Sequence, residues 1–141
     1  MRKNIIAFVM LMLIPNVIFG NDRIPWINNI STGIVIAKKY KLPVIVFVYS
    51  ETCRYCIQSI KNFEKAELKD VLSSGKIVPI SIKKGSKQLL DYSLSVNTYP
   101  TYFLLSSNGE MVVAPLNGYV EPIELASYLK KFIEWNKKVQ R

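Results

Sequence analysis

The chain has 141 residues, of which half are hydrophobic, and this length suits one globular domain and is too short for two. Its 19 Lys and Arg residues against 10 Asp and Glu residues give a formal net charge of +9, and it contains no histidine. The lack of histidine excludes His-dependent catalytic triads, His–Cys proteases and most catalytic zinc sites. Because the lysines are scattered, we interpret the charge as a solvated surface and expect no nucleic-acid partner.

The first 20 residues have the composition of a signal peptide. Arg2 and Lys3 are positively charged, residues 5–14 form an apolar run, Pro15 breaks that run, and Gly20 is a small residue that suits cleavage. An uncleaved membrane anchor is the alternative, although the apolar run is shorter than the roughly 20 residues that a span needs.

Cleavage after Gly20 would divide the chain into a signal peptide at 1–20 and one folded domain at 21–141. The mature protein would then be periplasmic or secreted, where disulfides persist, and it would keep no stable membrane span. We expect this domain to be a monomer.

The first elements of the domain follow from hydrophobic spacing. Apolar residues recur at helical spacing over residues 26–40, although the Ser-Thr-Gly sequence at 31–33 interrupts them, so the regular helix is expected to begin near Thr32. Pro43 then separates this helix from the next element. The apolar, β-branched run at 44–49 predicts a buried strand.

The only two cysteines, Cys53 and Cys56, follow this strand with two residues between them. Apolar residues at helical spacing over 57–72 predict one long helix directly after them. The side chains expected in its core are those of Ile57, Ile60, Phe63, Ala66 and Leu68. The pair would therefore lie where a strand gives way to a helix, at a point where helix N-terminal N–H groups stabilise a thiolate.

Turn residues divide the second half of the chain into short elements. In chain order we expect a strand at 77–82, a helix at 88–94, a strand at 101–105, a strand at 110–114 and a helix at 122–137. Pro79 places the first of these strands at a sheet edge or a bulge. Asn108-Gly109 predicts a hairpin turn, and Pro122 suits the first position of the last helix.

Helices join the early strands, which are therefore expected to be parallel, whereas the hairpin makes the last two strands antiparallel. The predicted fold is an α/β protein, a three-layer α/β/α sandwich with a mixed sheet.

This order of elements, with a dithiol after the first core strand, resembles the thioredoxin superfamily over residues 26–135. The sequence Cys-Arg-Tyr-Cys at 53–56 matches the family's C-x-x-C, and Pro100 matches its cis-proline that faces the dithiol. Asn108-Gly109 matches its late hairpin, and Gly118 its glycine before the last helix. Within the superfamily the chain is similar to small secreted or periplasmic proteins, including the C-terminal domain of the periplasmic disulfide reductase and sulfur-oxidation thioredoxins.

Two positions depart from the pattern of cytoplasmic thioredoxin. Thr52 stands where that protein has a Trp before the first cysteine, and Phe47 stands where it has a buried Asp. The missing acid removes the family's usual proton acceptor for the second cysteine. Glu51 is close enough in sequence to take this role through a water molecule.

The resemblance implies a thiol–disulfide oxidoreductase without a cofactor. Cys53 would be the nucleophile, Cys56 would resolve the mixed disulfide, and the two would form the Cys53–Cys56 disulfide when oxidised. The implied substrate-binding residues are Arg54, Tyr55, Tyr99 and Pro100. The implied partners are protein thiol or disulfide substrates and a redox partner protein. No metal is expected, since zinc needs four ligands and the chain has two cysteines and no histidine.

The direction of electron flow stays open at this point. Reduction of a client is the preferred interpretation, and disulfide oxidase or isomerase-type activity is the alternative. Arg54 favours the alternative because its charge would stabilise the thiolate of the reduced form. A non-catalytic binding module with a structural disulfide is a further alternative, but a loop this short gives a disulfide little entropic effect.

Overall fold

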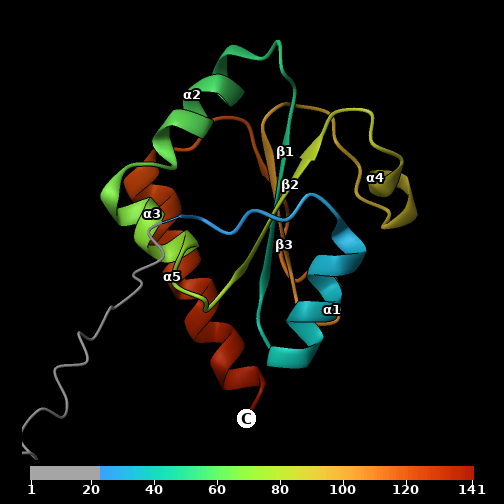
Figure 1. Ribbon diagram of the computed structural model, residues 1–141, viewed down its shortest axis with the longest axis vertical. Helices are drawn as coiled ribbons and strands as arrows, with labels where there is room; N and C mark the ends of the chain where they lie inside the picture. Colours follow the sequence, from blue (N-terminus) through green and yellow to red (C-terminus); the bar gives the residue numbers. More distant parts are fainter. Residues whose placement is uncertain (1–22) are drawn as a thin grey trace, which may run out of the picture.

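A four-stranded mixed sheet with helices on both faces is formed by residues 23–141, the part of the chain that the computed structural model describes (Figure 1). Its elements are α1 (Ile30–Tyr40), β1 (Val44–Tyr49), α2 (Arg54–Asn62), α3 (Ala66–Leu72), β2 (Val78–Lys83), α4 (Lys87–Asp91), β3 (Thr101–Leu105), β4 (Leu116–Asn117) and α5 (Pro122–Val139). The predicted α/β/α sandwich is confirmed. The predicted signal peptide at 1–20 lies outside the described residues.

The strands lie in the order β2-β1-β3-β4. β1 is parallel to β2 and antiparallel to β3, where Phe47 lies opposite Tyr102. Pro79 belongs to the edge strand β2, as predicted, since an edge strand tolerates a missing N–H. The segment before α1 covers part of this edge, because the backbone N–H of Ile27 donates to the carbonyl of Pro79 at 3.0 Å.

Alternate residues of β1 supply two separate cores, because successive side chains of a strand point to opposite faces. Ile45 and Phe47 pack against α3 and α5, whereas Val44, Val46 and Val48 pack against α1 and α4. All five side chains are at most 1% exposed. In Figure 1, α3 and α5 lie on one side of the sheet and α1 and α4 on the other. A strand buried on both faces is apolar throughout rather than alternating, which explains why its position could be predicted to the residue.

The prediction of one long helix at 57–72 is wrong, since α2 and α3 are separate helices. Glu64 N–H donates to Lys61 O at 3.2 Å and Lys65 N–H to Asn62 O at 3.0 Å, so tight i→i−3 turns close α2. Lys65 is extended, with φ −71° and ψ 137°, and the chain changes direction there before α3 begins.

This break changes which side chains of the two helices are buried. Phe63 and Leu68 lie in the core, as predicted. Ile57 and Ile60 are 45% and 46% exposed, and Ala66 is exposed as well, so these three core predictions are wrong. The apolar spacing of a single continuous helix does not hold across two helices with different axes.

The predicted returning strand at 110–114 is also wrong. Its residues make only a short antiparallel bridge to the end of β3, where Met111 lies opposite Leu105 and the Val112 N–H donates to Leu104 O at 3.2 Å. The paired strand is the two-residue β4 further on. The hairpin turn is where Asn108-Gly109 places it, with Gly109 at φ 83°. Pro115 lies in the gap before β4, and a proline has no N–H to donate to a neighbouring strand.

The remaining helices agree with the prediction to within a few residues. α1 begins at Ile30 rather than near Thr32, because the Asn29 side chain caps it by accepting from the Thr32 N–H at 2.8 Å. α4 is shorter than the predicted 88–94, and α5 begins at Pro122, as predicted. None of the helices in residues 23–141 is long and apolar enough to cross a membrane.

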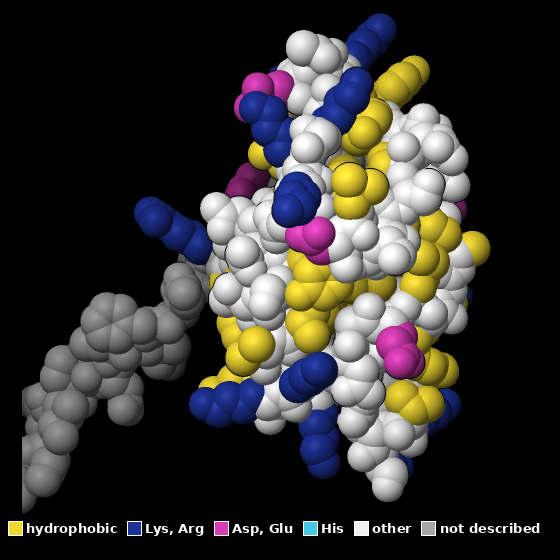
Figure 2. Space-filling view, turned by 90° about the vertical axis from the view of Figure 1, so that its right-hand side faces the viewer, with side chains coloured by type: hydrophobic (Ala, Val, Ile, Leu, Met, Phe, Trp, Pro, Cys, Tyr) yellow, Lys and Arg dark blue, Asp and Glu magenta, His cyan; other side chains and the backbone are white. Residues whose placement is uncertain are grey.

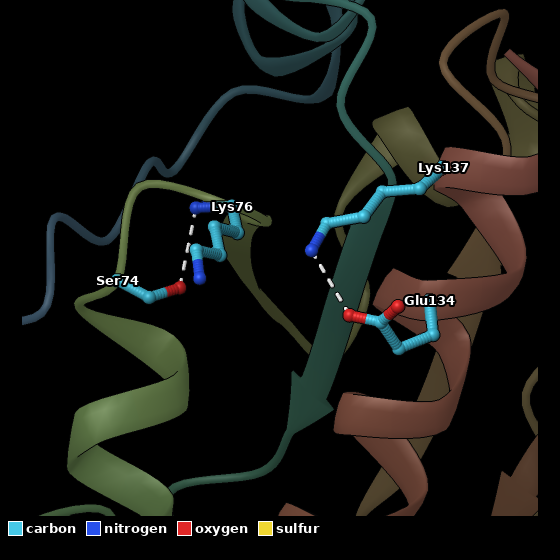
Figure 3. Close-up of polar contacts among 4 residues, drawn as sticks. All are labelled: Ser74, Lys76, Glu134 and Lys137. Atoms are coloured by element: carbon cyan, nitrogen blue, oxygen red, sulfur yellow. Dashed lines mark hydrogen bonds and ion pairs between the residues drawn. The ribbon is translucent and has the colours of Figure 1, made fainter. Parts of the chain in front are cut away.

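The described surface carries scattered positive charge. Figure 2 shows Lys and Arg side chains spread among hydrophobic ones, with fewer acidic side chains on that face. In Figure 3, Lys76 N–H donates to Ser74 Oγ at 3.2 Å, and Lys137 Nζ pairs with Glu134 at 2.9 Å. The Lys137 ammonium lowers the pKa of Glu134, but exposed pairs of this kind contribute little to stability.

We predict that Gly33→Ala destabilises the fold. Gly33 is buried where α1 crosses β2, and a Cβ there would collide with Cδ1 of Ile80 and lie 2.9 Å from its Cγ1. Alanine improves helix propensity by about 1 kcal/mol, whereas overpacking costs about 1–3 kcal/mol. We expect the free energy of unfolding, measured by urea denaturation, to fall by roughly 1 kcal/mol.

Ile80→Val is the matched control, because it removes the colliding methyl group. In a double-mutant cycle, Gly33→Ala should cost clearly less in the Ile80→Val background than alone. A Gly33→Ala protein as stable as the wild type would contradict this close approach of α1 to β2.

Candidate active site

Cys53 caps the N-terminus of α2, just after β1 ends. Its φ of −84° and ψ of 116° are not helical, and its sulfur accepts a hydrogen bond from the backbone N–H of Cys56 at 3.2 Å. Its own N–H donates to Ser50 O at 3.2 Å, which closes a tight turn between strand and helix. The predicted position of the dithiol is therefore confirmed, with the Cys53 sulfur next to the unpaired N–H groups of the helix.

The two cysteines differ in exposure and in acidity. Cys53 is half-buried, whereas Cys56 is 0% exposed, and both are free thiols in this structure. Burial raises the pKa of Cys56 to about 11, and a hydrogen bond with the Cys53 thiol adds to this effect. Cys56 is therefore a protonated thiol at neutral pH. The disulfide between the two residues stays a prediction.

Tyr99 and Pro100 reach the dithiol from the loop before β3. The peptide bond between them is cis, and the Cys53 thiol donates to the Tyr99 carbonyl oxygen at 3.3 Å. Pro100 is buried, and its carbonyl accepts from the Gly118 N–H at 2.7 Å. The structure thus brings together residues that lie 46 positions apart in the sequence. Their contacts with a substrate stay a prediction.

Arg54 and Tyr55, the other two predicted substrate contacts, form the exposed first turn of α2. The Tyr55 ring lies 5.9 Å from the ring of Tyr119, in the loop before α5. On the other side, the Lys84 ammonium lies 5.3 Å from the centre of the Tyr99 ring. The surface beside Cys53 is therefore aromatic and positively charged.

Glu51, the predicted proton acceptor for the second cysteine, has a different partner. Its carboxylate pairs with Lys83 at 2.9 Å, and both side chains are largely exposed. This carboxylate raises the pKa of Lys83. Glu51 therefore pairs with Lys83 at the end of β2 rather than with Cys56.

A polar face of α2, which the sequence interpretation missed, lies behind the dithiol. Its buried side chains are those of Cys56, Ser59 and Asn62, spaced three residues apart. Ser59 Oγ donates to Tyr55 O at 2.7 Å, and Asn62 Nδ2 donates to the Tyr119 hydroxyl at 2.8 Å. The three-residue spacing that begins at Cys56 is the sequence signal of this buried face, but serine and asparagine do not belong to an apolar pattern.

Tyr102 in β3 faces the same region. It is 1% exposed, and burial raises the pKa of its hydroxyl to about 12. The Ser59 hydroxyl lowers this pKa, whereas charge on Cys56 or on Tyr119 raises it further. The phenol is therefore protonated at neutral pH.

No group of three or more His, Cys, Asp or Glu residues within 23–141 could hold a metal ion.

Comparisons with solved structures show which known folds this arrangement matches. A mutant thioredoxin from Halobacterium salinarum NRC-1 aligns with a TM-score of 0.61 at 16% identity, over 79% of this chain and 92% of that one. A thioredoxin from Thermus thermophilus aligns with a TM-score of 0.63 at 21% identity, over 75% of this chain and 84% of that one. A thioredoxin from Malassezia sympodialis aligns with a TM-score of 0.56 at 15% identity, over 77% of this chain and 89% of that one.

Identities this low show the fold alone, and a search of curated protein sequences finds no match. The family assignment comes from a sequence model described as a thioredoxin-like domain, which matches residues 31–133. This match covers most of the chain and includes the dithiol, Tyr99 and Pro100. The chain therefore belongs to the thioredoxin-like family.

Proposed function

We propose that the protein is an extracytoplasmic thiol–disulfide oxidoreductase that reduces protein disulfides through Cys53 and Cys56. One observation carries the proposal: a half-exposed sulfur caps a helix and accepts the N–H of a buried second cysteine. Thiol–disulfide exchange needs an accessible thiolate and a second thiol that resolves the mixed disulfide. This pair supplies both from one helical turn.

In the proposed reaction, the Cys53 thiolate attacks a client disulfide and forms a mixed disulfide, and one client sulfur leaves as a thiolate. Cys56 then attacks the Cys53 sulfur, which releases the second client sulfur as a thiol and closes the Cys53–Cys56 disulfide. The client gains two electrons and the dithiol loses two. A redox partner protein returns the dithiol to its reduced form.

The contacts of Cys53 support reduction as the direction. Strong oxidants of this fold stabilise the thiolate of their reduced form. Here the Cys53 sulfur accepts one backbone N–H but also donates to the Tyr99 carbonyl, and only a protonated thiol makes that second contact. Arg54 is exposed on the first turn of α2. The Tyr99 contact stabilises the neutral thiol form of the site, and it is the observation that supports reduction over oxidation as the direction.

The extracytoplasmic location rests on the sequence of residues 1–20. A positive start, an apolar run and a small residue at Gly20 form the pattern of a cleaved signal. A reductant outside the cytoplasm has protein disulfides available as substrates.

We predict that Cys56→Ser traps client proteins as mixed disulfides. Cys53 stays free to attack in this variant, but no thiol is present to release the client. Purified Cys56→Ser, mixed with a disulfide-containing protein and analysed by non-reducing electrophoresis and mass spectrometry, should carry the client on Cys53. Cys53→Ser is the matched control and should trap none, because Cys56 is fully buried. Trapping by Cys53→Ser, or by neither variant, would contradict the proposed roles.

We also predict a strong pH dependence for client release. The pKa of Cys56 is raised to about 11, so its thiolate fraction below this value is small and grows by up to about tenfold for each pH unit. Single-turnover release from the mixed disulfide, followed by stopped-flow fluorescence, should therefore accelerate from pH 6 to pH 9. A release rate that is constant above pH 7.5 would show that Cys56 is already ionised there.

A further inference from the structure

Lys84 lies beside the dithiol, although the proposed exchange reaction does not use it. It directly follows β2, and its backbone N–H donates at 2.7 Å to the carbonyl of Tyr49, the last residue of β1. Its ammonium lies 5.3 Å from the centre of the Tyr99 ring. The Tyr99 carbonyl in turn accepts from the Cys53 thiol at 3.3 Å. A single residue, Tyr99, therefore contacts both the lysine and the nucleophile.

The Tyr99 ring holds the Lys84 ammonium beside the site without neutralising its charge. A cation over an aromatic face is attracted by the electrons of the ring and stays open to solvent on its other side. Lys84 is exposed and Tyr99 is half-buried, so the ammonium can bind an anion from solvent while it keeps this contact. Its backbone is fixed at the ends of two paired strands, which limits how far the side chain can move away.

The other charges of this surface leave it positive. Glu51 pairs with Lys83 at 2.9 Å, so its carboxylate is already neutralised. Arg54 is exposed and directly follows Cys53. Within the part of the chain that the structure describes, neither Arg54 nor Lys84 forms an ion pair. Two cations without acidic partners therefore lie beside the nucleophile, and a client with acidic side chains is the one that complements them.

We propose that Lys84 selects clients that carry an acidic side chain within a few residues of the cysteine that Cys53 attacks. The inference rests on the proposed function and names the class of client on which it acts. An extended client advances about 3.3–3.6 Å per residue, so an Asp or Glu close to the attacked sulfur can reach the ammonium over the Tyr99 ring. A basic side chain there would meet the like charges of Lys84 and Arg54. No proton or electron passes through Lys84.

The test compares two disulfide-linked peptide dimers of equal length, one with glutamate and one with lysine on both sides of the cysteine. Reduced protein is mixed with each dimer at pH 7 and about 0.1 M ionic strength, and stopped-flow fluorescence follows release of the first half, which reports the attack by Cys53. The readout is the ratio of the glutamate to the lysine rate constant. A variant that alters the reactivity of Cys53 itself changes both rate constants equally and leaves this ratio unchanged.

We expect Lys84→Gln to lower the ratio about threefold and Lys84→Glu to lower it about fivefold or more, since exposed ion pairs are weak individually. Lys84→Arg keeps the charge and should keep the ratio within about 1.5-fold of wild type. At about 1 M salt the ratios of wild type and Lys84→Gln should converge, because the ions screen the exposed ammonium.

Lys39→Glu is the matched control. The Lys39 ammonium is exposed and lies 5.3 Å from the centre of the Tyr40 ring, so it carries the same charge in the same kind of contact. It precedes β1, at the end of that strand opposite to Cys53. The strand is roughly 20 Å long, which exceeds the screening length of about 10 Å at this ionic strength. The ratio for Lys39→Glu should therefore stay within about 1.5-fold of wild type.

Three results would overturn the inference: Lys84→Glu keeps the wild-type ratio, Lys39→Glu lowers the ratio as much as Lys84→Glu does, or Lys84→Arg loses the preference although it keeps the charge. The proposed function fails separately, and it does so if wild type attacks neither peptide. If wild type attacks both peptides and the Lys84 variants share its ratio, only the role of Lys84 fails.

Discussion

The hydrogen bond from the Cys56 backbone N–H to the Cys53 sulfur is the contact on which the proposed chemistry of this protein depends. It exists because β1 ends at Tyr49 and α2 begins at Arg54, so that Cys53 takes the cap position between them. β1 is held from both faces by two apolar cores and from both edges by neighbouring strands. The sulfur at its end therefore has a fixed position, as thiol–disulfide exchange requires.

The same helix gives the two cysteines opposite environments. The cap position leaves Cys53 partly open to solvent, whereas Cys56, three residues later, points into the protein with Ser59 and Asn62. Burial raises the pKa of Cys56, so in the proposed mechanism the resolving thiol is protonated at neutral pH. On the same face, Ser59 donates to the Tyr55 carbonyl and Asn62 to the Tyr119 hydroxyl.

The sequence correctly predicted those elements whose position depends only on residues close by in the chain. The strand at 44–49, the Asn108-Gly109 turn and the start of α5 at Pro122 each follow from side-chain shape and backbone restrictions within a few residues. The division between α2 and α3 was not predictable in this way, because the apolar spacing continues across the extended backbone of Lys65, where the chain changes direction. For the same reason Ile57 and Ile60 were misplaced. The position of Tyr102 opposite Phe47 depends on strand register, which a single sequence does not display.

The reduction potential of the Cys53–Cys56 pair, measured at equilibrium against glutathione, tests the account most directly. A reductant should give a value near that of thioredoxin, about −270 mV. A value near −120 mV, roughly that of the strong oxidant DsbA, would contradict the proposed direction. Failure of the two cysteines to form an intramolecular disulfide at any glutathione ratio would contradict the redox role itself.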